Sequence, residues 1–227
     1  MTAIRQGWAI LRKDLLLEMR SKEVFTSQFL FVVMAMVIFY FAFSPNIKNL
    51  TTVGAGMLWV AITFTSLLGL NRSFVHEKDE ECLDGLLLCP VDRATIFAAK
   101  FIGNFFFLTT LEVIAVPIFA FFFLTGTFLP NLGWFLLILL LGNVGICGVG
   151  TLLATISMNT RARDLLLPVL FLPVMVPVII PMVLATNYIF TQGESMSELS
   201  VWLYTMAIFD IMYVVAGYVL YDFVIGD

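Results

Sequence analysis

The sequence has little of what enzymes use for chemistry. Its 227 residues include one histidine, His76, and three cysteines, none of which forms a C-x-x-C pair. A single histidine cannot build a two-histidine metal site or an H-E-x-x-H helix, and this cysteine pattern gives no zinc or redox motif. The chain also has no G-x-x-x-x-G-K-[ST] loop to cradle nucleotide phosphates. We therefore do not expect it to hydrolyse ATP by itself.

Charged residues are scarce as well, at 12% of the chain against 61% apolar residues. Because so few polar groups cannot cover a soluble globule of this size, the apolar surface must face lipid. The apolar residues gather in six continuous runs, most of about 20 residues or more, which is enough to cross roughly 30 Å of hydrocarbon as helices. The runs lack the alternation of barrel strands. We predict one all-α integral membrane domain, residues 1–227, with six transmembrane helices over 25–43, 53–70, 94–124, 132–157, 165–185 and 201–224.

The positive charge lies on one side of this six-span pattern. Eleven of the twelve Lys and Arg residues precede the first span or come shortly after the second or the fourth span, and only Lys48 lies elsewhere. Short basic loops are retained in the cytoplasm, so this distribution predicts that both termini are cytoplasmic. The eleven residues are Arg5, Arg12, Lys13, Arg20, Lys22, Arg72, Lys78, Arg93, Lys100, Arg161 and Arg163.

The segment before the first span, residues 1–23, has no unbroken apolar stretch and is not expected to be a cleavable signal peptide; within it, residues 3–22 are expected to form a helix. Its apolar residues recur at helical spacing, with basic residues mostly on other faces. This pattern predicts an amphipathic helix lying in the cytoplasmic interface, or alternatively a soluble helix that packs on a partner. The apolar positions are Ile4, Trp8, Leu11, Leu15 and Met19.

The longest polar loop, residues 71–93, follows the second span. Acidic residues stand where they suit the N-terminus of a short helix, leucines give that helix an apolar face, and a proline ends it. We expect a short cytoplasmic helix whose leucines either contact a partner or pack on the chain's own helices and the membrane interface. The residues concerned are Glu77, Glu81, Leu83, Leu86, Leu87 and Pro90.

Two carboxylates, Glu112 and Asp210, stand well inside apolar runs. Charges there are costly, so each predicts a buried functional or paired site in which the carboxyl is neutral or hydrogen bonded within the bundle, near Asn104 or Asn143. The alternative is that they only hold helices together.

The fifth span contains four prolines, Pro168, Pro173, Pro177 and Pro181. Each removes a backbone donor, so we expect a helix that is kinked, weakened or interrupted and that faces protein. It is either a statically kinked packing helix or a moving gate.

Small residues recur along the fourth span, at Gly142, Gly145, Gly148 and Gly150. They permit close helix contact, either at a dimer seam or within one subunit.

The polar loop resembles the corresponding loop of ABC-2 type export permeases. There, acidic residues precede Leu-acidic-x-Leu-Leu, a Pro-Val pair and a later lysine. This chain has Glu77, Leu83-Asp84, Leu86-Leu87, Pro90-Val91 and Lys100, with Glu81-Cys82 in place of the family's Gly-Thr. The resemblance implies that the segment is a coupling helix that docks into an ATPase subunit.

Two further stretches are similar to the CcmB family, the permease component of the cytochrome c maturation system. They are the opening Arg12-Lys-Asp-Leu-Leu-Leu-Glu-Met-Arg20 and the run from Arg161-Ala-Arg-Asp to Pro181. The resemblance implies a homodimeric permease in the bacterial inner membrane, working with a CcmA-like ATPase that binds ATP and Mg²⁺, a CcmC-like haem-handling subunit and a small CcmD-like subunit. ATP hydrolysis would then serve haem handling or the release of a haem-loaded, CcmE-like periplasmic chaperone.

Three alternatives are also compatible with the sequence. The chain could be an ABC-2 permease for a lipid, drug or polysaccharide, or a passive scaffold. It could also be a membrane enzyme with Glu112 and Asp210 as acid and base, although two carboxylates without a nucleophile or metal set fall short of a catalytic constellation. In each case the expected surroundings are membrane lipid and protein, with no nucleic acid and no cofactor held by this chain alone.

Overall fold

The computed structural model describes residues 3–20, 22–43, 50–79, 91–124, 128–158, 160, 163–191 and 196–226. The regular structure in this part of the chain is α-helical throughout. The helices are α1 (Ala3–Arg20), α2 (Lys22–Phe43), α3 (Leu50–Asp79), α5 (Arg93–Phe123), α6 (Phe128–Met158), α7 (Arg163–Thr191) and α8 (Met196–Gly226).

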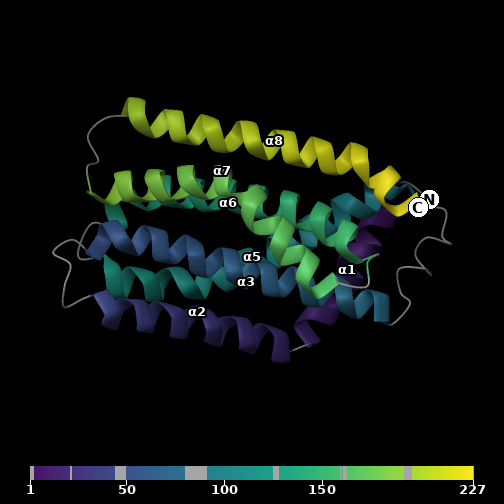
Figure 1. Cartoon of the computed structure of the whole chain (residues 1–227), viewed down its shortest axis with the longest axis horizontal. Coiled ribbons are helices and arrows are strands. Elements are labelled where there is room, and N and C mark those ends of the chain that lie inside the picture. The colour runs from purple at the N-terminus through teal and green to yellow at the C-terminus, as the bar shows by residue number, and fades with distance from the viewer. Residues whose placement is uncertain are drawn as a thin grey trace.

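The six long helices from α2 to α8 form an elongated bundle, and α1 crosses one end of it (Figure 1). The beginning of α1 and the end of α8 lie together at that end, which we call the α1 end; the opposite end is the far end. Each of the six long helices has a stretch long and apolar enough to cross a membrane. The predicted six-span, all-helical architecture is therefore confirmed at this level.

The helices differ in how deeply they are buried. In the apolar stretches of α3 and α6, 72% and 67% of residues are buried, against 17% in α2 and in α8. In Figure 1, α8 and α2 lie on opposite outer sides, with the other helices between them. The exposed side chains of α2 and α8 are largely Leu, Ile, Val, Phe and Met, as expected of a surface that faces lipid. α3 and α6 thus form the interior of the bundle.

The glycines of α6 let that helix sit in the interior. A Cβ atom on Gly142 would lie 2.5 Å from the Trp59 ring of α3, and one on Gly145 would lie 2.6 Å from an Asp210 oxygen of α8. On Gly148 it would lie 3.3 Å from Val214. These close approaches show that the glycines serve packing within one subunit, which is one of the two uses that the sequence left open.

The prolines of α7 bend the helix without breaking it. α7 is one α-helix from Arg163 to Thr191, and Figure 1 shows it changing direction midway. The span is therefore kinked rather than interrupted at its prolines, because the remaining backbone hydrogen bonds carry the helix through. In the first half of α7 one face is packed, since Phe171 and Met175 are buried whereas Val169 is exposed. Near its end the helix is buried on more than one face, since the consecutive residues 188–190 are all buried.

Several helices extend beyond the apolar runs that predicted them. α3 begins at Leu50, α7 continues to Thr191, and α8 begins at Met196. These helices are longer than the apolar runs alone indicate. Polar residues next to a span continue its helical backbone hydrogen bonding outside the hydrocarbon.

Candidate functional site at the α1 end

The predicted coupling residues fall mostly outside what the structure describes. Glu81, Leu83, Leu86, Leu87 and Pro90 lie outside the described residues, so the coupling helix stays a prediction. Glu77 lies in α3, which continues to Asp79. This places Asp79 nine residues, or about 14 Å of helix, beyond Leu70 at the end of the apolar stretch. The chain is described again from Val91, and α5 begins at Arg93.

α1 is docked on the beginning of α5. Ile10 and Leu11 of α1 are buried, and Ile10 belongs to a small apolar cluster with Ile96, Phe97, Ala99 and Tyr221. This cluster is separate from the main core of the bundle. The predicted N-terminal helix is thus present, but its buried face is centred on Ile10 and Leu11. Trp8, which the periodicity placed on the same apolar face as Leu11, is 64% exposed.

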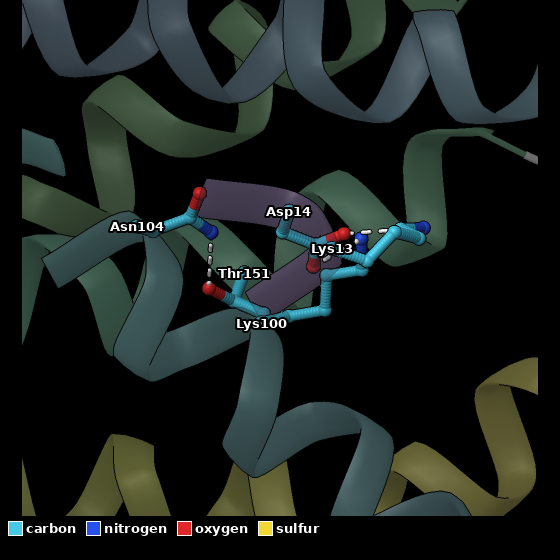
Figure 2. A network of polar contacts seen from close by, with 5 residues as sticks. All are labelled: Lys13, Asp14, Lys100, Asn104 and Thr151. Carbon is cyan, nitrogen blue, oxygen red and sulfur yellow. Dashed lines mark hydrogen bonds and ion pairs between the residues drawn. The ribbon is translucent and has the colours of Figure 1, made fainter. Parts of the chain in front are cut away.

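A buried ion pair fixes α1 to α5 (Figure 2). The Nζ atom of Lys100 lies 2.9 Å from Oδ2 of Asp14, and their side chains are only 5% and 13% exposed. Lys13 lies on the outer side of the same carboxylate, with Nζ 3.1 Å from Oδ1 and a side chain that is 37% exposed. A buried charge whose partner is removed costs about 3–5 kcal/mol. The pair therefore makes the docked position of α1 strongly dependent on Lys100.

From the sequence, Lys100 is one of the basic residues and the later lysine of the ABC-2 pattern, and Asp14 has no predicted role. The helical spacing of Asp14 does contain a signal for this contact. Asp14 follows Ile10 by four residues and Leu11 by three, so it shares their helix face. A carboxylate on the packing face of an amphipathic helix calls for a cation on the neighbouring helix.

Farther along α5, polar side chains join α5 to α6. Nδ2 of Asn104 donates to Oγ1 of Thr151 at 3.1 Å, one turn beyond Lys100 (Figure 2). Two turns farther, Nδ2 of Asn143 donates to Oε2 of Glu112 at 2.6 Å. Thr109 also accepts a hydrogen bond from Nδ2 of Asn143, at 3.3 Å. We call Thr109 and the four residues of the two preceding hydrogen bonds the polar seam.

Glu112 is 3% exposed and is hydrogen bonded to Asn143, one of the two partners that the sequence suggested. Asn104, the other suggestion, bonds to Thr151 instead. Asp210 is equally buried, and neither of its oxygens has a hydrogen-bond partner among the described residues.

The two carboxylates contact different sides of α6. Glu112 meets Asn143, whereas an Asp210 oxygen lies against Gly145. Asn143 and Gly145 are two residues apart, which corresponds to a rotation of about 200° around the helix axis. α6 therefore stands between the two carboxylates. They do not form an acid–base pair, and the described His, Cys, Asp and Glu residues form no group of three or more that would hold a metal ion. The geometry therefore gives no support to a membrane enzyme built on Glu112 and Asp210.

Comparison with known proteins agrees with this non-catalytic arrangement. The family model described as CcmB protein matches residues 5–223. Heme exporter protein B of Rhodobacter capsulatus is 28% identical over 172 residues, covering 76% of this chain and 78% of that protein. The proteins of the same name from Paracoccus denitrificans and Pseudomonas aeruginosa are 28% and 27% identical, over 76% and 75% of this chain and 78% and 76% of their own lengths. Since the family match extends over nearly the whole sequence, the chain belongs to the CcmB family of membrane permease subunits.

Proposed function

We propose that this chain is the permease subunit of an ABC transporter for cytochrome c maturation in a bacterial inner membrane. It couples ATP hydrolysis by a separate subunit to haem handling or to release of a haem-loaded periplasmic chaperone. The observation that carries this proposal is the CcmB family match over residues 5–223, together with relatives named heme exporter protein B. The partners are a CcmA-like ATPase, CcmC-like and CcmD-like membrane subunits, a CcmE-like chaperone and a second copy of the chain.

The α1 end is the proposed cytoplasmic end. The basic residues Arg5, Arg12, Lys13 and Lys100 all belong to α1 and the first turns of α5, which lie there. Placing this end in the cytoplasm agrees with the charge distribution of the whole sequence. It also puts residues 80–90, the predicted coupling helix, on the side where ATP is available.

The contacts at the α1 end support a mechanical role for the coupling helix. α5 begins three residues after Pro90, and Lys100 in its second turn is paired with Asp14 of α1. A force on residues 80–90 would therefore reach α5 and α1 together. From α5 the polar seam continues to α6, through Asn104–Thr151 and Glu112–Asn143. These polar contacts, part-buried at Asn104–Thr151 and buried at Glu112–Asn143, would let docking of an ATPase change helix positions deeper in the membrane.

The test of the cellular role is deletion of the gene in its own organism, followed by haem staining of membrane proteins for covalently attached haem. We expect c-type cytochromes to disappear and to return when the intact chain is supplied. Unchanged c-type cytochromes, in a strain without a second copy of the gene, would contradict the proposal and leave an ABC-2 exporter of another substrate.

The coupling step is tested by supplying the deletion strain with a permease that carries Glu77→Arg and Glu81→Arg. We expect this variant not to restore the c-type cytochromes. Glu81 lies in the predicted coupling segment and Glu77 lies shortly before it in α3, so reversing both charges should weaken association with the ATPase subunit. We expect less ATPase subunit to co-purify with this variant at an unchanged level of permease in the membrane. A complex with normal composition and normal ATP turnover would contradict the placement of the coupling helix.

A further inference from the structure

An apolar groove of about 390 Å³ lies at the α1 end, between α1, the first turns of α5 and the last part of α8. Small side chains such as Ala98 and Ala99 of α5 line it, and Ala99 is buried. Two aromatic side chains stand at its edges, Trp8 of α1 and Tyr218 of α8, which are 64% and 54% exposed. Exposed Trp and Tyr beside an apolar surface are typical of the boundary between membrane and water.

Two cations of α1 stand beside Trp8, at the edge of the groove. Arg5 and Arg12 are exposed, and they stand three residues before and four residues after Trp8. This spacing puts all three on one face of the helix. Among the described residues that line the groove, none is acidic. The edge of the groove on α1 is therefore complementary to a negatively charged group.

The opposite side of the groove leads along the lipid-facing surface. Ile102 lines the groove and is followed one turn later on α5 by exposed Phe106. On α8, Tyr218 is followed toward the far end by exposed Val215 and Ile211. The groove thus opens from a cationic, aromatic edge onto a continuous apolar surface. A ligand that fits both parts has an anionic head and a long hydrocarbon chain.

We infer that this groove binds an anionic phospholipid, with its phosphate between Arg5 and Arg12 and one acyl chain lying along Ile102 and Tyr218. Such a lipid would contact α1, α5 and α8 at once, and so would hold α1 in its docked position beside the Asp14–Lys100 pair. This inference goes beyond the proposed function, because neither haem handling nor ATP coupling requires a lipid site. It requires only that the α1 end lies at a membrane surface.

The test is carried out on the full chain within its purified complex, in nanodiscs of phosphatidylcholine with a photoreactive phosphatidylglycerol. We expect crosslinks in α1 and the first turns of α5, which added phosphatidylglycerol suppresses and added phosphatidylcholine does not. Each basic residue near a membrane surface strengthens binding to anionic lipid about fivefold. The exposed double substitution Arg5→Gln, Arg12→Gln should therefore lower the apparent affinity roughly thirtyfold.

A second variant keeps the arginines and fills the groove. Ala98→Trp should abolish the crosslinks, whereas Val113→Trp, which adds the same bulk at an exposed position of α5 outside the groove, should leave them unchanged. Equal competition by phosphatidylcholine would overturn the inference, as would unchanged crosslinking of both groove variants. Recovery of haem rather than lipid at these residues would overturn it too. The arginine variants, which leave the core intact, keep the test valid if Ala98→Trp does not fold. Loss of c-type cytochromes is not the readout, so failure here is distinct from failure of the proposed function.

Discussion

At the far end of the bundle, aromatic rings from four helices pack directly on one another, whereas at the α1 end a buried ion pair and the small apolar cluster around Ile10 join α1 to α5. The far-end cluster consists of Tyr40, Phe119, Phe123, Phe135 and Phe190. Its ring centroids are separated by 5.3 Å for Phe135–Phe190 and 5.5 Å for Phe119–Phe123. Phe119 also lies 6.3 Å from Phe135, and Tyr40 lies 5.9 Å from Phe123.

The difference concerns how each end responds to force. In lipid there is little hydrophobic drive for helices to associate, so close packing and polar contacts hold them together. Packed aromatic rings keep much of their dispersion energy through small shifts, because it is shared over many atoms. An ion pair away from water is either made or broken, because a lone buried charge is very costly. We therefore expect the far end to stay packed through small shifts and the α1 end to change in discrete steps.

The largest expected effect comes from breaking the ion pair. Lys100→Met leaves the Asp14 carboxylate with the more exposed Lys13 as its remaining ion-pair partner among the described residues, and should cost at most about 3–5 kcal/mol. Thermal unfolding of the purified permease and protease sensitivity of α1 in membranes measure this loss. Lys13→Met is the matched control, because Lys13 contacts the same carboxylate from an exposed position and its removal should cost about 1 kcal/mol or less. Equal effects of the two substitutions would show that the Lys100 pair is not the lock between α1 and α5.

The second effect is loss of a ring from the far-end cluster. Phe135→Ala removes a fully buried ring, and Phe to Ala in protein cores costs about 3–5 kcal/mol. For this membrane protein we expect the lower limit of about 3 kcal/mol, because the ring is surrounded by lipid rather than water when the helices separate. The readout is unfolding of the permease in mixed detergent micelles, with Phe121→Ala, at an 83% exposed position, as the control. Protease sensitivity of α1 should stay normal in Phe135→Ala; increased cleavage would mean that the two ends are not independent.

A smaller effect is expected from crowding the middle of the bundle, between the two ends. Gly142→Ala adds a methyl group 2.5 Å from the Trp59 ring, and overpacking of this kind costs about 1–3 kcal/mol. It should also disturb the hydrogen bond from Nε1 of Trp59 to Oγ1 of Thr186, which a change in tryptophan fluorescence reports. Gly133→Ala is the control, because a Cβ atom there meets nothing within 4 Å. A fully stable Gly142→Ala variant would contradict the close approach of α3 and α6.

The smallest effect concerns the polar seam. Glu112→Gln keeps an oxygen that accepts from Asn143, so assembly and stability should stay close to those of the original chain. Glu112→Leu removes that acceptor and should cost about 1 kcal/mol, the usual range for a hydrogen bond between membrane helices. Unfolding and c-type cytochrome yield are compared for both variants. Normal yield with Glu112→Gln would remove any essential protonation role, and lost yield with normal stability would establish one.

Much of the architecture was predictable because it depends on local composition. Six apolar runs of sufficient length gave the six spans, and the periodicity of residues 3–22 gave α1. The buried carboxylate Glu112 and the candidate partner Asn143 were also recognisable, because a charged residue inside a span must be satisfied within the bundle. Its actual partner was one of two candidates that helical spacing alone did not separate. The continuity of α7 through four prolines was not predictable, because it depends on the neighbours that pack against the helix.

The sequence by itself determined that the chain is an all-helical membrane protein with six spans, since the cost of leaving backbone groups unpaired in lipid permits little else. Its motifs also indicated the CcmB family. Only the tertiary structure decided that Asp14 pairs with Lys100, that Glu112 and Asp210 lie on different sides of α6, and that the α6 glycines pack inside the subunit. These facts depend on which helices are neighbours and how they are rotated. Rotation about a helix axis is set by packing between side chains far apart in the sequence, and an almost uniformly apolar span carries little record of it.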